Sequence, residues 1–255
     1  MESKRMVARI CAFTHRGAVR ARNEDTIAVE AWVRSVSMKR PHTVSLPLEP
    51  GVLCLVADGM GGHAVGHIAS DLAARSIIAA KDSLKDAADV PAVIASANEA
   101  IYRAMDERSE WVGMGTTVAG LLLREDTVFW FNVGDSPIFS FDSGFLRQRS
   151  IDDYADGHHQ GLDARSHAIT QSLGGTPTPV ALHANAGTEK AAPRLGNRYL
   201  LCSDGLTDML SLGAIETAFE EDDVRTTESL FTHAMNAGGG DNISMILVTL
   251  ALAAD

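Results

Sequence analysis

The sequence has few cysteines, no apolar run long enough to cross a membrane and no excess of positive charge. Its three cysteines, Cys11, Cys54 and Cys202, lie singly inside apolar runs, so neither a disulfide framework nor a redox pair is expected. The longest apolar run, 243–254, is shorter than the ~18 to 20 residues that a transmembrane helix needs. A net charge of −11 disfavours nucleic-acid binding, whose affinity comes largely from positive charge. Arg9 interrupts the apolar segment that an export signal would require. These absences predict a cytoplasmic protein with no membrane insertion and no nucleic-acid partner.

The sequence also lacks an internal repeat or an interdomain linker. Its 255 residues are 45% hydrophobic and 22% charged, which is typical of a folded globular chain. A chain of this length can form one large domain or two small ones. We expect a single domain over residues 1–255 and a monomer.

Hydrophobic periodicity indicates runs of strands separated by pairs of helices. Strands are predicted at 7–13, 25–33, 52–57, 116–123, 127–133, 137–141, 198–202 and 243–252. Helices are predicted after the glycine-rich turn that ends at Gly62, and at 90–107, 205–219 and 224–236. Residues 37–50 and 143–195 are expected to be irregular, the second segment being a mobile surface region with one short helical candidate. This order favours an α+β class, with antiparallel sheets and helices on their outer faces.

Carboxylates occur repeatedly where an apolar strand begins or ends. The residues concerned are Glu24, Asp25, Asp58, Asp135, Asp204 and Asp241. Each alone is most simply a turn former or a helix N-cap. If the sheets bring these ends to one rim, however, the carboxylates would repel one another unless cations neutralise them. Because the donors are all oxygen, Mg²⁺ or Mn²⁺ is favoured over Zn²⁺.

Two other patterns near Asp58 predict different sites. Gly59-x-Gly61-x-x-Ala64 fits the dinucleotide-binding fingerprint, but Asp58 would confront the pyrophosphate. His63 and His67 have the spacing of a helical zinc pair, but no catalytic Glu and no third ligand accompany them. Neither pattern is favoured over the carboxylate site.

Six short motifs in order resemble the metal-dependent, type 2C Ser/Thr protein phosphatases, and the sequence is similar to bacterial members of that family. The motifs are Gly17-x-Val19-Arg20-x-x-Asn23-Glu24-Asp25, Val56-Ala57-Asp58-Gly59-Met60-Gly61-Gly62-His63, Gly115-Thr116-Thr117, Asn132-Val133-Gly134-Asp135-Ser136, Ser203-Asp204-Gly205-Leu206-x-Asp208 and Asp241-Asn242. The resemblance covers nearly the whole chain. It implies a four-layer α/β/β/α sandwich of two antiparallel sheets flanked by pairs of helices, with two Mn²⁺ or Mg²⁺ ions at one end.

The resemblance also implies a role for each matching residue. Asp58 would bridge both metals, with the Gly59 carbonyl on one of them, and Asp204 and Asp241 would hold the first metal. Glu24 and Asp25 would support the second metal, partly through waters. The positions of a third, weaker metal are matched by Asp135, Asp204 and Asp208, and Arg20 matches the phosphate-binding arginine.

The implied reaction is hydrolysis of phosphoserine or phosphothreonine in proteins, by direct attack of a water that bridges the metals. Phosphorylated proteins, including a Ser/Thr kinase or its targets, would be the partners. Met60 stands where many eukaryotic relatives have a histidine, so the general acid is unassigned. Residues 143–167 would form a flap that helps to choose substrates. The alternative is a catalytically weak member that acts as a phosphoprotein-binding regulatory module.

Overall fold

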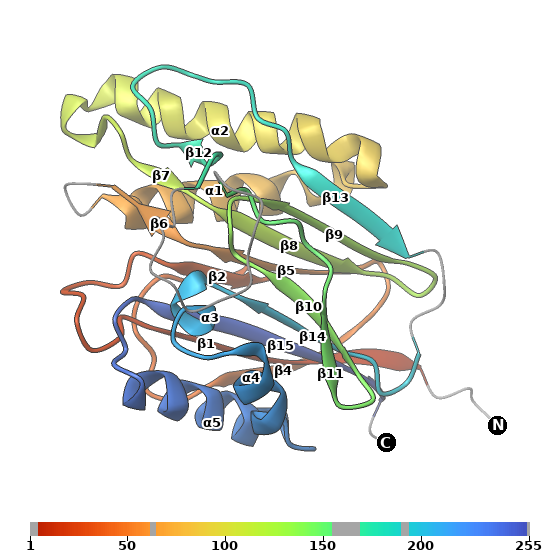
Figure 1. Ribbon diagram of the computed structural model, residues 1–255. Coiled ribbons are helices and arrows are strands. Elements are labelled where there is room, and N and C mark those ends of the chain that lie inside the picture. The colour runs from red at the N-terminus through yellow and green to blue at the C-terminus, as the bar shows by residue number, and fades with distance from the viewer. Residues whose placement is uncertain (1–4, 62–64, 155–168, 190–193, 254–255) are drawn as a thin grey trace.

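The computed structural model describes residues 5–61, 65–154, 169–189 and 194–253. Two six-stranded antiparallel sheets lie face to face, and helices cover the outer face of each sheet (Figure 1). This arrangement confirms the predicted α+β class and its order of layers.

The first sheet is centred on two long strands and has the order β11-β10-β14-β15-β1-β4. Its strands are β1 (Met6–His15), β4 (His42–Pro47), β10 (Ile138–Asp142), β11 (Phe145–Gln148), β14 (Arg198–Cys202) and β15 (Ile243–Leu252). The pairing of β1 with β15 runs from Met6 opposite Leu252 to His15 opposite Ile243.

The second sheet has the order β13-β9-β8-β5-β2-β3. Its strands are β2 (Thr26–Val29), β3 (Trp32–Arg34), β5 (Val52–Ala57), β8 (Val118–Leu123), β9 (Val128–Val133) and β13 (Asn185–Glu189). A small third sheet contains β6 (Gly59–Met60), β7 (Gly115–Thr116) and β12 (Leu173–Gly174).

Helices α1 (Gly66–Ala79) and α2 (Val90–Glu107) cover the second sheet (Figure 1). The first sheet is covered by α3 (Asp204–Thr207), α4 (Leu212–Ala218) and α5 (Asp223–Asn236). Short 3₁₀ turns are η1 (Lys81–Ser83), η2 (Ala87–Asp89) and η3 (Ser109–Trp111). Among the described residues, no helix has both the length and the apolar character needed to span a bilayer.

The side chains of β5 explain how the layers are held together. All six residues of this strand are buried, because Leu53, Leu55 and Ala57 pack under α1 and α2. The alternate residues pack between the two sheets. The continuous apolar run read from the sequence therefore reflects a strand that is covered on both faces.

Three segments differ from the predicted elements. The segment 37–50 contains β4, and the described part of the segment 143–195 contains β11, β12 and β13 and no helix. The single strand predicted at 25–33 is divided into β2 and β3 at Glu30, which has a positive φ of 52°. Of the predicted flap at 143–167, residues 155–167 lie outside the described part of the chain. The part before them includes β11, paired with β10.

The register of the two sheets brings the predicted carboxylates to one end of the sandwich. In the first sheet β1 ends and β15 begins at the His15–Ile243 pair, and Cys202 at the end of β14 lies opposite Met245. In the second sheet Thr26 at the start of β2 lies opposite Ala57 at the end of β5. The loops that carry the carboxylates leave the sheets at these positions.

Candidate metal and phosphate site

Seven of the nine predicted site residues line one cavity of about 450 Å³ at this end of the sandwich. They are Arg20, Glu24, Asp58, Gly59, Asp135, Asp204 and Asp241. Met60, Gly61, Thr117, Ile169 and Asn242 complete its lining. The structure thus brings together carboxylates that five separate loops supply.

Asn242 holds the loop that carries Arg20 and Glu24. Its Oδ1 accepts a hydrogen bond of 2.7 Å from the Glu24 backbone N–H. Its Nδ2 donates to the backbone carbonyls of Arg16 at 3.1 Å and Arg22 at 3.0 Å. Both ends of the loop are therefore fixed to the start of β15. The sequence analysis named Asn242 only as part of the Asp241-Asn242 motif. Its position directly after Asp241 was the signal that could have pointed to a role in the site.

Asp25 does not line the cavity but lies buried beneath it. Its Oδ2 accepts hydrogen bonds from Ser244 Oγ at 2.6 Å and Ser203 Oγ at 2.9 Å. Ser244 Oγ in turn lies 2.7 Å from Thr14 Oγ1, which accepts from Asn23 Nδ2 at 2.8 Å. This chain of buried polar groups joins the two sheets under the cavity. Sequence reasoning named Ser203 only as part of a motif and missed the role of Ser244.

Asp58 is positioned through its backbone by the Thr116-Thr117 pair. Its carbonyl oxygen accepts from Thr117 N and Thr116 Oγ1, both at 2.9 Å, and its N–H donates to Thr117 Oγ1 at 3.1 Å. Thr117 Oγ1 also lies 2.7 Å from Ser136 Oγ, which follows Asp135. The Gly-Thr-Thr and Gly-Asp-Ser motifs are thus connected beside the cavity.

Glycines at two positions allow the backbone to approach closely. A Cβ at Gly59 would lie 2.3 Å from the Glu24 carbonyl oxygen and 2.4 Å from that of Gly66. A Cβ at Gly205 would lie 1.9 Å from the Asn242 carbonyl oxygen. Any larger residue would separate the loops that carry Asp58, Asp204 and Asp241.

Three carboxyl groups of the site, those of Asp25, Asp58 and Asp135, have raised pKa values. Burial, followed by the charges of Asp25 and Asp204, raises the pKa of Asp58 well above its ordinary value. Burial also raises the pKa of Asp25 and of Asp135 to about 7, and in both cases the charge of Asp204 adds to the effect. A hydrogen-bonding contribution from the Asp204 side chain also raises the pKa of Asp58.

Arg20 supplies the positive charge at the edge of the cavity. Its Nη2 lies 2.5 Å from Asp241 Oδ2, while its side chain remains about half exposed at 55%. Burial opposes the charged form, but the Asp241 hydrogen bond and the surrounding carboxylates raise the pKa of Arg20 overall. The guanidinium therefore stays protonated and has further N–H donors available for an anion.

The donor set fits hard divalent cations. Glu24 Oε1 and Asp25 Oδ1 are buried acceptors that have no hydrogen-bond partner among the described residues. Buried carboxylate oxygens are costly without a partner, and an oxygen-only donor set matches Mg²⁺ or Mn²⁺. As the side chains stand, no three His, Cys, Asp or Glu residues of the described ranges are grouped closely enough to hold an ion.

The other residues that the sequence patterns singled out do not line the cavity or are not described. Asp208 is not among the described lining residues, although its charge contributes to the raised pKa of Asp135. His67 lies 3.2 Å from an Arg22 nitrogen. His63 and Ala64, which the zinc and dinucleotide patterns required, lie outside the described residues.

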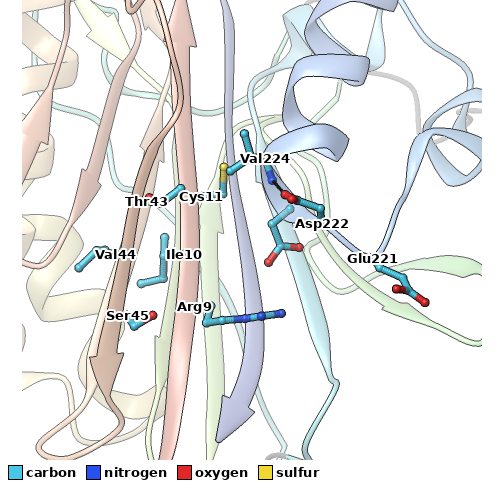
Figure 2. Close-up of a pocket in the computed structure, with 10 residues that line it drawn as sticks. Arg9, Ile10, Cys11, Thr43, Val44, Ser45, Glu221, Asp222 and Val224 are labelled. Atoms are coloured by element: carbon cyan, nitrogen blue, oxygen red, sulfur yellow. Dashed lines mark hydrogen bonds between the residues drawn. The ribbon is translucent and has the colours of Figure 1, made fainter. Parts of the chain in front are cut away.

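A second cavity, of about 480 Å³, lies on the outer face of the first sheet between β1, β4 and the start of α5 (Figure 2). Arg9 and Cys11 on β1 and Asp222 before α5 belong to its lining (Figure 2). Burial raises the pKa of the Cys11 thiol to about 11, so it stays protonated near neutral pH. Thr227 Oγ1 also donates a hydrogen bond to its sulfur. None of the predicted site residues lines this cavity.

Comparison with known proteins gives the family. The family described as "Protein phosphatase 2C" matches residues 47–244. The serine/threonine protein phosphatase PstP of Mycobacterium tuberculosis is 31% identical over 260 residues, which cover 95% of this chain and 45% of PstP. The serine/threonine phosphatase stp of Listeria innocua is 28% identical over 254 residues, covering 92% of this chain and 93% of stp.

A solved structure agrees with these matches. The crystal structure of the catalytic domain of PstP in complex with two manganese ions has a TM-score of 0.76 and 30% identity. The match covers 96% of this chain and 99% of that domain. This chain belongs to the protein phosphatase 2C family, as its motifs predicted, and it spans less than half the length of PstP.

Proposed function

We propose that the protein is a Mn²⁺- or Mg²⁺-dependent phosphatase that hydrolyses phosphoserine and phosphothreonine in proteins. The observation that carries the proposal is the convergence of Glu24, Asp58, Asp135, Asp204 and Asp241 on one cavity, with Arg20 at its edge. Carboxylates suited to divalent cations, next to an arginine suited to phosphate, support phosphoryl chemistry more than any other reaction. The PstP complex with two manganese ions supports the same chemistry.

Two metals would be held by the residues that lie around this cavity. Asp58 would contribute to both and the Gly59 carbonyl to one of them, Asp204 and Asp241 would hold the first, and Glu24 with Asp25 would support the second. When bound, divalent ions supply a more acidic water and offset negative charge on the phosphoryl oxygens. A third, weaker ion would use Asp135, Asp204 and Asp208.

The side chains of the cavity favour direct attack by water on phosphorus. Thr117 is the one Ser, Thr or Cys among the described lining residues. Its hydroxyl already accepts from Asp58 N and lies 2.7 Å from Ser136 Oγ. A covalent enzyme intermediate would need a hydroxyl or thiol free to attack and a base to activate it.

Arg20 would orient the phosphoryl group at the edge of the cavity. Its Nη2 is held by Asp241, so the side chain is directed before substrate binds. The remaining guanidinium donors would contact phosphoryl oxygens in the ground state and in the transition state. Substrates would be phosphorylated proteins, including a Ser/Thr kinase or its targets.

The test is hydrolysis of an aryl phosphate and of a phosphothreonine peptide, with Mn²⁺, with Mg²⁺ and after chelation. We expect activity with the metals, none after chelation, and a loss of at least about 10³-fold in kcat for Asp58→Asn and Asp204→Asn. Asp106→Asn, an exposed position on α2, is the matched control and should retain activity. Circular dichroism would check that each variant is folded.

Two results would contradict the proposal. Hydrolysis that persists in Asp58→Asn after chelation would place the chemistry elsewhere. Binding of the phosphopeptide without any turnover in either metal would instead favour the phosphoprotein-binding module.

A further inference from the structure

Positive charge is concentrated in the N-terminal part of this acidic chain. Residues 1–48 contain nine Lys and Arg residues and four Asp and Glu residues. Residues 49–255 contain the other 13 basic and 29 acidic residues. Between residues 31 and 48 there is no acidic residue at all. Such an asymmetry indicates a surface that meets an anionic partner.

The fold places two loops from this part side by side. Ser37 Oγ accepts from Arg16 N at 2.9 Å, and Thr14 O accepts from Met38 N at 2.9 Å. Ser35 O accepts from Asn23 Nδ2 at 3.4 Å. These loops, with Arg34 at the end of β3 beside the second one, carry five exposed basic residues, which we call the cationic ledge: Arg16, Arg22, Arg34, Lys39 and Arg40.

The ledge borders the mouth of the carboxylate cavity. Arg22 Nη1 lies 3.2 Å from His67 Nε2, and His67 is the second residue of α1. Gly66, the first residue of α1, packs against Gly59 in the cavity lining. Arg22 is also two residues from Arg20 and from Glu24, both of which line the cavity.

The ledge is held in place before any partner binds. Asn242 binds the backbone carbonyls of Arg16 and Arg22, and Ala18 N donates to Gly239 O at 2.8 Å. Because the backbone of this loop is already fixed, a ligand that contacts it would not have to order the backbone first.

The ledge has the composition of a contact surface. Among the described residues, Arg16, Arg34, Lys39 and Arg40 have no carboxylate within ion-pair distance. Val19 is 71% exposed and Val36 is 54% exposed, one on each loop. Glu228 on α5 lines a cavity together with Lys39, so an acidic residue lies at the edge of the ledge on that side. Arginines mixed with exposed apolar side chains are typical of protein-binding sites.

We propose that the cationic ledge binds an acidic segment of the phosphoprotein substrate, next to the phosphorylated residue. This inference rests on the proposed phosphatase function. A protein segment is favoured over a nucleic acid because the net charge of −11 would repel an extended polyanion beyond the ledge. The exposed valines would contact side chains of the same segment.

The test compares two phosphothreonine peptides that differ only in three flanking residues, Glu in one and Gln in the other. The ledge variant is Arg34→Ala/Lys39→Ala/Arg40→Ala, which leaves the loop of Arg20 and Glu24 unchanged. The control, Lys85→Ala/Arg103→Ala/Arg225→Ala, removes the same charge from exposed positions elsewhere. We expect wild type to have a KM about threefold to tenfold lower for the Glu peptide, and this preference to shrink as salt is raised.

The ledge variant should lose that preference with kcat on an aryl phosphate unchanged, while the control should keep it. An equal preference in the ledge variant, or none in wild type, would overturn the inference. Anisotropy of a fluorescent, unphosphorylated Glu peptide tests the ledge without turnover. If the aryl phosphate is not hydrolysed but this peptide still binds at the ledge, the proposed function fails and the docking surface stands.

A second copy of the chain bound at the cationic ledge would also be detected. A salt-sensitive dimer that the ledge variant abolishes, without any peptide preference, would identify a second copy of the chain as the partner and overturn the inference. Sedimentation of wild type and both variants at assay concentration would detect it.

Discussion

At the residue scale, Asn242 shows how one amide side chain can position a loop of the candidate site. It is 4% exposed and makes three hydrogen bonds to the backbone of residues 16–24. The alternation of acceptor and donor atoms on one side chain suits an amide and no other group of that size. Arg20 and Glu24 depend on these bonds for their place beside Asp241.

We predict that Asn242→Ala lowers kcat/KM by about tenfold to a hundredfold, because Arg20 and Glu24 lose their fixed positions. The free energy of unfolding should fall by about 2 to 4 kcal/mol, since buried backbone groups lose their partners. Steady-state kinetics and urea unfolding would measure both effects.

The control for this prediction is Asn197→Ala. Asn197 Oδ1 accepts a backbone hydrogen bond from Arg194 at 2.7 Å, away from the cavity. Its loss should reduce stability slightly and leave kcat/KM unchanged. Wild-type kcat/KM in Asn242→Ala would show that the loop keeps its position without the amide.

The sequence identifies some residues of the site better than others. A carboxylate at a strand end is visible as a local pattern, and Glu24, Asp58, Asp135, Asp204 and Asp241 are found in this way. The hydrogen-bond partners of Asp25 could not be predicted from a local pattern, because Ser203 and Ser244 are 178 and 219 residues away from it in sequence. Long-range hydrogen bonds leave no periodic signal.

At the element scale, strongly patterned segments were predicted well. The predicted helix at 90–107 matches α2, because its apolar residues follow the helical period and Pro91 stands in the first turn. Three of the strands that were missed, β4, β11 and β13, are edge strands of the two large sheets, and each pairs with one neighbour. Their residues are largely exposed or half-buried, so they lack the apolar run that reveals a central strand.

The close packing of β6 against α1 depends on Gly59. We predict that Gly59→Ala lowers the free energy of unfolding by about 2 kcal/mol or more, because the new Cβ meets two backbone carbonyls that cannot move independently. It should also remove most activity, since β6 follows Asp58 directly. Thermal unfolding and aryl phosphate hydrolysis would measure the two effects.

Gly213→Ala is the matched control for this substitution. Gly213 lies in α4, and a Cβ there would meet no atom within 4 Å. Alanine in a helix is favoured over glycine by about 0.5 to 1 kcal/mol, so this variant should be as stable as wild type or more so. Equal stability of both variants would contradict the assigned role of Gly59.

At the scale of the whole molecule, the net negative charge opposes binding of the phosphorylated substrate that we propose. The net charge is −11, and the cavity itself is lined by carboxylates. Favourable binding of an anionic substrate therefore requires local positive charge that exceeds this background. Arg20 and bound cations would supply it inside the cavity, and the cationic ledge would supply it outside.

The raised carboxyl pKa values link this charge distribution to stability. Asp25 and Asp135 have pKa values of about 7 in the folded protein, against 3.8 for an unperturbed side chain. A carboxyl group with a raised folded pKa stabilises the fold in its protonated form. That contribution is complete below about pH 4 and is lost as the pH rises through about 7.

We therefore predict that Mn²⁺ stabilises the protein more at pH 8 than at about pH 5.5, because the ion replaces protons that these carboxyl groups bind. At an Mn²⁺ concentration of about 100 times Kd, the gain of about 2.7 kcal/mol should raise Tm by roughly 5 to 10 °C at pH 8. Without Mn²⁺, in the presence of a chelator, Tm should be lower at pH 8 than at about pH 5.5. Asp135→Asn should weaken that fall, whereas Asp106→Asn should not change it. An Mn²⁺ effect that is equal at both pH values, or larger at the lower one, would show that protons and metal do not compete for these carboxylates.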